Sequence, residues 1–207
     1  RTRQRLRKCS LFVTTRSQAL TDASFEKLKQ IIWMPYQTST ATIDDLDQVA
    51  QLIDDYVRQN LNMPAWPCSL ATFKRDYTSG CFRMTVIHCD KKLVGFAAWL
   101  PHYDLHHCSH GAECIDMYVD PAYRCRGLGV ALLCAIAAEI TNLGWTYIRG
   151  QALSGRASRL YARVGVCFGT NEYNLSGKAL RQLAGLAGKS PKEILRGLPT
   201  QEMNYQP

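Results

Sequence analysis

Two spacings of hydrophobic residues run along the chain, and they predict helices and strands. Apolar positions three to four residues apart predict amphipathic helices over residues 21–32, from Asp44 or Asp45 onward, and over roughly 69–78. Short runs rich in β-branched and aromatic residues predict strands instead. The expected strands are residues 36–43, 81–88, 93–100, 113–119 and 145–151, with two short closing strands at 166–168 and 171–175.

The segment from 113 to 151 predicts a strand, a loop, a helix and a second strand. The loop over 120–129 contains glycine and basic residues, and an apolar helix follows over 130–143 until Gly144 ends it. Two parallel strands joined by one helix form a right-handed crossover. With a further helix over 154–164, the pattern predicts an α/β or α+β domain with a mixed sheet.

An antiparallel hairpin is expected before this unit, with strands 81–88 and 93–100 joined by a turn over 89–92. A polar loop over 102–111 then leads to the next strand and crowds several histidines beside Cys108. This cluster leaves a transition-metal site open as an alternative, but no ligand spacing is fixed and we expect no metal. Contacts to a substrate are favoured for the side chains of this loop: Tyr103, Asp104, His102, His106, His107 and His110.

Length and charge divide the chain into three parts. Its 207 residues fit one domain of about 150 residues with terminal additions. We expect a basic arm and short helix over 1–35, the main domain over 36–176, and a helical, then polar, extension over 177–207. The net charge is +8, and the first eight residues carry five of these charges. The arm is expected to be a solvated terminus, with binding to nucleic acid or an anionic surface as the alternative.

Cysteine usage and hydropathy predict a cytoplasmic protein. The nine cysteines are odd in number and irregularly spaced, with no C-x-x-C pair, so reduced thiols are favoured over disulfides or a zinc finger. Cys134 lies in an apolar helical run and is expected in the core. No apolar run approaches the roughly 18 residues needed to cross a bilayer, so we expect no membrane partner.

The sequence Arg124-Cys-Arg-Gly-Leu-Gly129 follows a strand and opens a helix. Glycines at 127 and 129 let backbone amides approach a ligand closely, and the helix N-terminus adds a positive end. Arg124 and Arg126 add charge, so the loop suits a pyrophosphate. The P-loop pattern and the dinucleotide-binding fingerprint are both absent.

The chain resembles the GNAT superfamily of N-acetyltransferases over about residues 36–176. The family signature [QR]-x-x-G-x-[GA] is matched by Arg124, Gly127 and Gly129. The preceding DMYVDPAYR, the hairpin strand LVGFAAW and the later SGRASRLYARVGV are similar to other family segments. The resemblance implies a mixed, mostly antiparallel central sheet with flanking helices and a strand–loop–helix coenzyme A site. Ser154 and Val166 depart from the residues that are usual in the family.

The resemblance implies acetyl-coenzyme A as cosubstrate, with its pyrophosphate on the loop and its pantetheine arm paired like a strand with the backbone at Met117 and Val119. A backbone amide of this strand can also donate to the thioester oxygen. No metal is expected. The implied coenzyme-binding residues are Met117, Val119, Arg124, Arg126, Gly127, Leu128, Gly129, Val130 and Ser154.

Two side chains are candidates for the chemistry. Tyr161 matches the family tyrosine that faces the sulfur and can protonate the departing thiolate, although a purely packing role is the alternative. Asp116 is the preferred base, acting directly or through water, with a salt-bridge role as its alternative. By the period of two, Glu113 lies on the other face of a regular strand from Asp116, unless a β-bulge re-aims one of them.

The resemblance therefore implies acetyl transfer from acetyl-coenzyme A to a primary amine by direct attack. A small amine, a protein amino group and an aminoacyl-tRNA all stay open as acceptors, and a homodimer is left open. A non-catalytic module that binds acetyl-coenzyme A as a sensor is the alternative, since fold alone does not exclude it. Nucleic-acid binding through residues 1–8 is the third interpretation.

Overall fold

The computed structural model describes residues 35–152, 155–168 and 172–203. The chain divides into two units, Arg1–Ile32 and Trp33–Pro207, and the described residues all belong to the second. The predicted helix over 21–32, the basic arm and Ser154 lie outside the described residues. The boundaries expected at 35 and 176 stay predictions.

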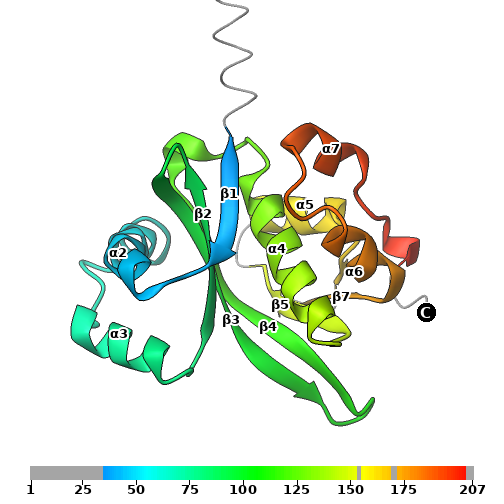
Figure 1. Ribbon diagram of the computed structural model, residues 1–207, viewed down its shortest axis with the longest axis horizontal. Helices are drawn as coiled ribbons and strands as arrows, with labels where there is room; N and C mark the ends of the chain where they lie inside the picture. The colour runs from blue at the N-terminus through cyan, green and yellow to red at the C-terminus, as the bar shows by residue number, and fades with distance from the viewer. Residues whose placement is uncertain (1–34, 153–154, 169–171, 204–207) are drawn as a thin grey trace, which may run out of the picture. The chain divides into compact units, whose positions relative to one another are not determined.

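One seven-stranded sheet forms the centre of the second unit, in the order β1-β2-β3-β4-β5-β7-β6 (Figure 1). Among the strands that the structure describes, only β4 and β5 pair in parallel, and every other neighbouring pair is antiparallel. The predicted mixed, mostly antiparallel sheet is thus confirmed. The strands are β1 (Tyr36–Thr40), β2 (Arg83–Cys89), β3 (Lys92–Asp104), β4 (Ser109–Val119), β5 (Tyr147–Gln151), β6 (Cys167–Phe168) and β7 (Glu172–Ser176).

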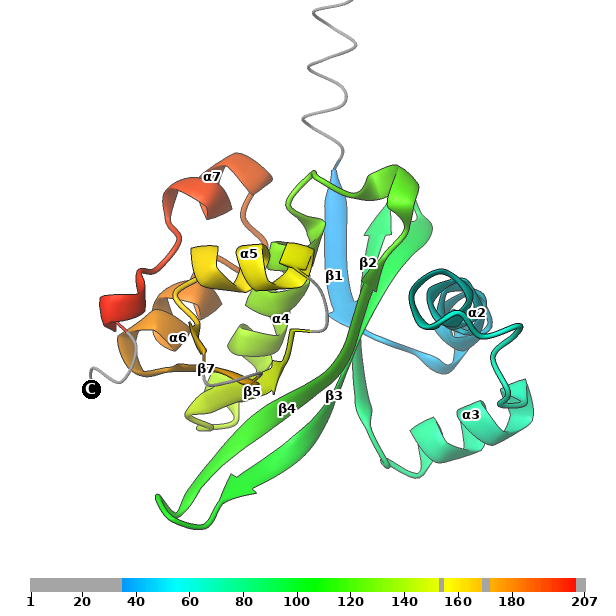
Figure 2. The ribbon, with the colours of Figure 1, turned by 180° about the vertical axis from the view of Figure 1, so that it is seen from behind.

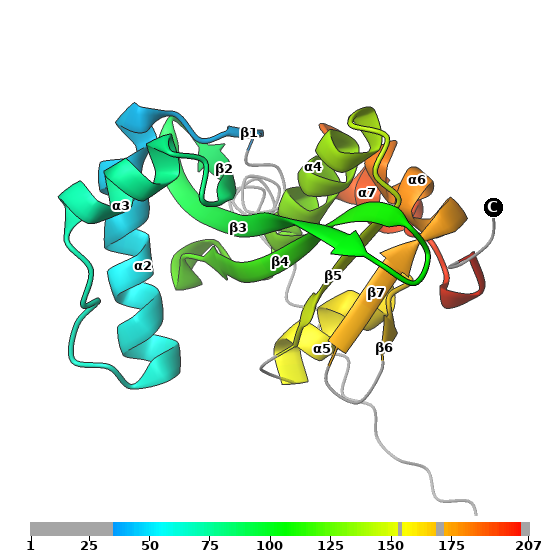
Figure 3. The same ribbon diagram turned by 90° about the horizontal axis from the view of Figure 1, so that it is seen from below.

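Helices flank both faces of the sheet. On β3, Ala97 and Trp99 pack into the core that contains α4, whereas Phe96 and Ala98 pack into a second core beneath α2 and α3. Successive residues of a strand point to opposite faces, so α4 and the α2–α3 pair cover opposite sides, as Figure 3 shows. The helices are α2 (Leu46–Leu61), α3 (Leu70–Thr78), α4 (Leu128–Asn142), α5 (Gly155–Arg163), α6 (Gly177–Ala184) and α7 (Pro191–Arg196).

Helix α4 is apolar around most of its surface because three neighbours cover it. The sheet covers one side, and α6 and α7 lie along another (Figure 1). Leu180 and Leu183 of α6 and Ile194 of α7 are all buried in the α4 core. The segment before α7 is tied to the sheet by Tyr36, whose hydroxyl donates to the Lys189 carbonyl. Cys134 is fully buried as predicted, and burial raises the pKa of its thiol to about 12.

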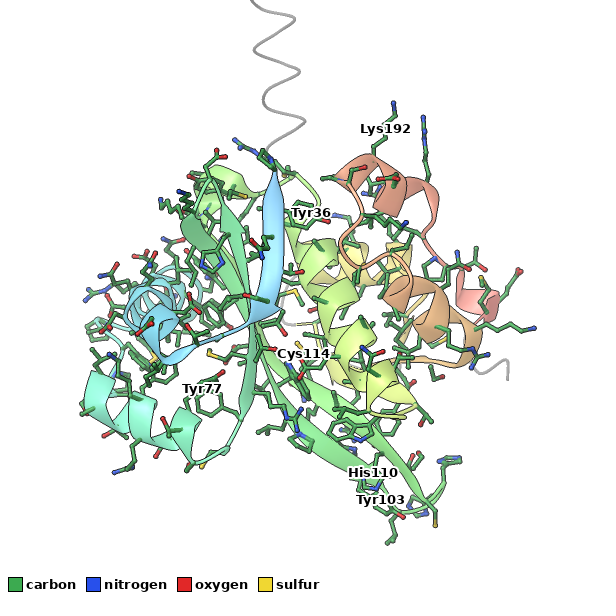
Figure 4. All side chains as sticks on the ribbon, in the orientation of Figure 1. Tyr36, Tyr77, Tyr103, His110, Cys114 and Lys192 are labelled. Carbon is green, nitrogen blue, oxygen red and sulfur yellow. The ribbon has the colours of Figure 1, made fainter. Side chains whose placement is uncertain are left out.

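The polar loop expected over 102–111 is wrong for most of its length. Strands β3 and β4 continue through it and turn only at 105–108, so the hairpin projects beyond the sheet (Figure 2). Tyr103 and His110 face each other across this hairpin with ring centroids 4.8 Å apart (Figure 4). The Asp104 carboxylate accepts from the His106 and His107 amides and thereby holds the turn. Aromatic and polar side chains alternate here in place of apolar ones, and this conceals the strand pattern.

Candidate active site

The glycine loop and the first turn of α4 form a ready anion site. Gly127 caps the helix with φ 82°, a left-handed conformation that favours glycine, and its carbonyl accepts the first helical hydrogen bond from Ala131, at 3.0 Å. The amides of the first helical turn have no carbonyl one turn earlier to bond to. The side chains of Leu128 and Val130 are buried, so these residues offer the site only their backbone.

Three segments close around this loop. A Cβ atom on Gly129 would lie 3.5 Å from Leu160 Cδ1 of α5 and 4.0 Å from Met117 Sδ of β4. A Cβ atom on Gly127 would lie 3.4 Å from Pro191 Cβ at the start of α7. The loop is therefore closely packed against β4, α5 and α7. These three elements border any ligand that contacts the loop backbone.

Both arginines of the loop contact residues that precede the loop in the chain, at the end of β4 and in the turn after it. Arg124 Nε donates to the Val119 carbonyl at 2.7 Å, and its guanidinium lies 5.2 Å from the centre of the Tyr118 ring. The Arg126 guanidinium lies 5.5 Å from the Tyr123 ring centre and donates to the Ala122 carbonyl at 3.1 Å. Arg124 thus joins the loop to the end of β4.

Strands β4 and β5 pair over a short stretch and then part. Gly111–Cys114 pairs with Tyr147–Gly150, whereas β3 pairs with β4 as far as Val119. Within the part of the chain that the structure describes, 115–119 has no strand partner on its β5 side. An extended ligand could pair with the backbone along this edge, where Met117 and Val119 lie, although the Val119 carbonyl already accepts from Arg124 Nε.

A β-bulge in β4 brings the two candidate carboxylates to one face. Asp116 lies opposite Ala98 and Cys114 lies opposite Trp99, so Ile115 is the extra residue. Cys114 then packs with Trp99 on the α4 side, and Glu113 and Asp116 both belong to the opposite face. A regular strand would place Glu113 and Asp116 on opposite faces, but the bulge brings them to the same face.

Asp116 is half-buried on the face of β4 that also carries Tyr118. Burial raises the pKa of the Asp116 carboxyl above its ordinary value, and the neighbouring Tyr56 hydroxyl of α2 acts in the opposite direction. A carboxylate with a raised pKa is a better proton acceptor than an exposed one.

Tyr161 lies in the apolar core beside Val164 and Val166, with only 5% of its surface exposed. It approaches the site from α5, whereas Asp116 is covered from α2. Figure 2 shows α2 and α5 on either side of the long β3–β4 hairpin. The two candidate side chains thus come from opposite faces of the sheet, Tyr161 from the α4 core and Asp116 from the α2 side.

The histidines of the projecting hairpin have separate partners. His102 contacts the Tyr147 hydroxyl, His107 bonds to Asp104 at 2.8 Å, and His110 stacks on Trp145 with ring centroids 6.1 Å apart. Among the described residues, no group of three or more histidine, cysteine or acidic side chains is placed to hold a metal ion. The same residues contain no helix long and apolar enough to span a bilayer.

Sequence reasoning missed two neighbours of the site, Tyr56 and Pro191, whereas Leu160 belongs to the SGRASRLYARVGV segment that carried the resemblance. Helical spacing does place Tyr56 on the packed side of its helix, three residues after Ile53 and four after Leu52. The contact of Tyr56 with the Tyr118 ring of β4 depends on tertiary packing, and helical spacing alone does not predict it.

The sheet order and the glycine loop are shared with proteins of one known family and fold. Residues 80–165 match the family described as the acetyltransferase (GNAT) domain. The matched stretch runs from before β2 to the end of α5 and includes the glycine loop whose motif carried the resemblance. A comparison with curated protein sequences finds no match.

Solved structures share this fold at low sequence identity. The chain is similar to yncA from Salmonella typhimurium with its cofactor acetyl-CoA (15% identity, 68% of this chain and 93% of that one, TM-score 0.57). It is similar to ribosomal-protein-alanine N-acetyltransferase from Brucella melitensis (18% identity, 68% and 99%, TM-score 0.56). It is also similar to phosphinothricin acetyltransferase from Sinorhizobium meliloti in complex with AcCoA (17% identity, 69% and 89%, TM-score 0.58). The acceptors in these names differ, so the likeness leaves the acceptor open.

Proposed function

We propose that this protein transfers the acetyl group of acetyl-coenzyme A to a primary amine by direct attack. The observation that carries the proposal is the gap beside 115–119, which opens next to the glycine loop at the start of α4. Solved structures of the same fold that contain acetyl-coenzyme A support the choice of cosubstrate.

The described residues fit this cosubstrate. The amides at 127–130 would bind the pyrophosphate, and the positive φ of Gly127 forms the turn that presents them. We assign Arg124 and Arg126 to the same site, and we also assign Ser154, which lies outside the described residues, on the family resemblance alone. Met117 and Val119 would pair with the pantetheine arm through their backbones. Acetyl-coenzyme A supplies an activated acetyl group as a thioester.

The protein's part in the chemistry is to move two protons. Asp116 accepts a proton from the attacking amine, directly or through one water, as the carbon–nitrogen bond forms. Tyr161 gives its phenolic proton to the sulfur as the carbon–sulfur bond breaks. Backbone amides of β4 stabilise the carbonyl oxygen while it carries extra charge.

A screen of acceptors tests the proposal. Thiol release from acetyl-coenzyme A is measured with small amines, peptides and aminoacyl-tRNA, and products are identified by mass. Release that depends on an acceptor and disappears in Asp116→Asn supports the transferase. Tight coenzyme binding with no acceptor-dependent release from any of the three groups would favour the sensor module instead.

A further inference from the structure

The segment over 189–192, which leads into α7, is packed into the domain. The Lys189 carbonyl accepts a hydrogen bond from the Tyr36 hydroxyl of β1. Helix α7 follows directly and buries Ile194 against α4, with 1% of that residue exposed. The segment is therefore held on both sides, by the sheet before it and by the α4 core after it.

This segment approaches the glycine loop at Gly127. A Cβ atom on Gly127 would lie 3.4 Å from Pro191 Cβ and 4.0 Å from Pro191 Cα. Gly127 precedes the first turn of α4, whose amides would bind the pyrophosphate. The family match covers residues 80–165, so the segment lies outside the matched stretch. A part of the chain beyond that match thus borders the proposed coenzyme site.

The charges of the segment favour an anionic ligand. Lys189 and Lys192 are both exposed, and Figure 4 shows the Lys192 side chain extending outward from α7. The carboxylate of the next residue, Glu193, accepts from the Ser190 amide at 3.0 Å and from the Ser190 hydroxyl. These bonds lower the pKa of Glu193, so its negative charge is kept and fixed as a helix cap. The two lysines outnumber it, and their long side chains extend into solvent.

The arginines of the glycine loop keep their charge close to the loop backbone. Arg124 donates to the Val119 carbonyl at 2.7 Å, and Arg126 donates to the Ala122 carbonyl at 3.1 Å. Acetyl-coenzyme A carries a pyrophosphate and also a separate 3′-phosphate on its ribose. With the pyrophosphate on the loop amides, the 3′-phosphate must be bound farther from the loop. Lysine suits such a position, because it binds phosphate as a point charge on a flexible stem.

We propose that Lys189 and Lys192 bind the 3′-phosphate of acetyl-coenzyme A. This inference rests on the proposed function, which places the pyrophosphate on the glycine loop. The segment before α7 then completes the coenzyme site: Pro191 packs beside Gly127, and the lysines on either side of this proline supply positive charge for the nucleotide end of the ligand.

The test is the double variant Lys189→Ala/Lys192→Ala, titrated by calorimetry with acetyl-coenzyme A and with its 3′-dephospho form. We expect affinity for acetyl-coenzyme A to fall about 10-fold, because two cations that face a phosphate are lost, and the loss should shrink at high salt. Affinity for the 3′-dephospho form should stay within twofold of wild type.

The matched control is Lys178→Ala/Arg181→Ala, which removes two exposed cations from α6. Helix α6 begins after Ser176, and Ser176 lies level with Tyr147 and Gly111 at the end of the sheet away from the glycine loop. We expect this variant to bind both ligands as the wild type does.

The outcomes separate this inference from the proposed function. Wild-type affinity for acetyl-coenzyme A in the folded Lys189→Ala/Lys192→Ala protein would overturn the inference. An equal fall for both ligands would also overturn it, because the lysines would then not act on the 3′-phosphate. A similar fall in the α6 control would do the same, since any lost cation would have this effect. A wild-type protein that binds neither ligand would instead remove the proposed function. Thermal melts establish that both variants are folded.

Discussion

Gly129 offers the sharpest test of the coenzyme site, because the structure predicts opposite results for two substitutions there. A Cβ atom at this position would meet Leu160 and Met117 at 3.5 and 4.0 Å, which is ordinary van der Waals contact. Gly129→Ala should therefore fold and bind acetyl-coenzyme A within about twofold of wild type. Gly129→Glu extends a carboxylate from the first turn of α4, where the ligand's pyrophosphate would lie.

Electrostatics sets the size of the effect. Two unit charges 4–8 Å apart repel by about 2–4 kcal/mol at an effective dielectric constant of about 20. Solvent exposure of the loop reduces this, so we expect affinity for acetyl-coenzyme A to fall at least ~10-fold, or about 1.4 kcal/mol. Part of the loss should disappear as salt is added, because exposed charges are screened.

Calorimetric titration of acetyl-coenzyme A into the two variants measures the difference directly. Thermal melts show that both are folded, and the alanine variant controls for the loss of glycine itself. Wild-type affinity in folded Gly129→Glu would refute the placement of the coenzyme phosphates on this loop. A large loss in Gly129→Ala would show that the space around Gly129 was misjudged.

Three further results are expected. Tyr161→Phe keeps the packed ring, so kcat and kcat/KM should fall together by ~10²-fold or more in steady-state assays while coenzyme affinity holds, and a wild-type kcat would assign Tyr161 to packing alone. Deletion of residues 1–8 should leave the melting temperature and coenzyme binding nearly unchanged, whereas a large drop in melting temperature would contradict a solvated arm. Gly165→Ala should lower the free energy of unfolding in urea by about 2–4 kcal/mol, since Gly165 has φ 77° and a Cβ would lie 2.8 Å from the Thr200 carbonyl, and an unchanged urea midpoint would refute this.

The strand, glycine loop and helix around 124–130 could be predicted from the sequence because each feature is local. A β-prone run, a glycine that must adopt positive φ and an apolar helical period all lie within about 30 consecutive residues. The parallel pairing of β4 with β5 is likewise confirmed.

What the sequence could not predict depends on long-range register. The bulge at Ile115 changes which face Glu113 occupies, and only the pairing with β3 reveals it. The contact between the Tyr56 and Tyr118 rings joins residues 62 positions apart, so no local pattern contains it. The long hairpin was missed for a different reason, since its tip is stabilised by aromatic and turn contacts in place of apolar alternation.

The covering of α4 by α6 and α7 has a consequence for the order in which the domain can form. The chain is made from its N-terminus, so α4 and the whole of β1–β5 exist before Leu180, Leu183 and Ile194 are available. Until those residues arrive, one flank of α4 is an apolar surface open to water and to other chains. The nascent protein is thus most exposed to aggregation and to chaperone capture late in synthesis, and a fragment that stops before α6 would keep that exposure permanently.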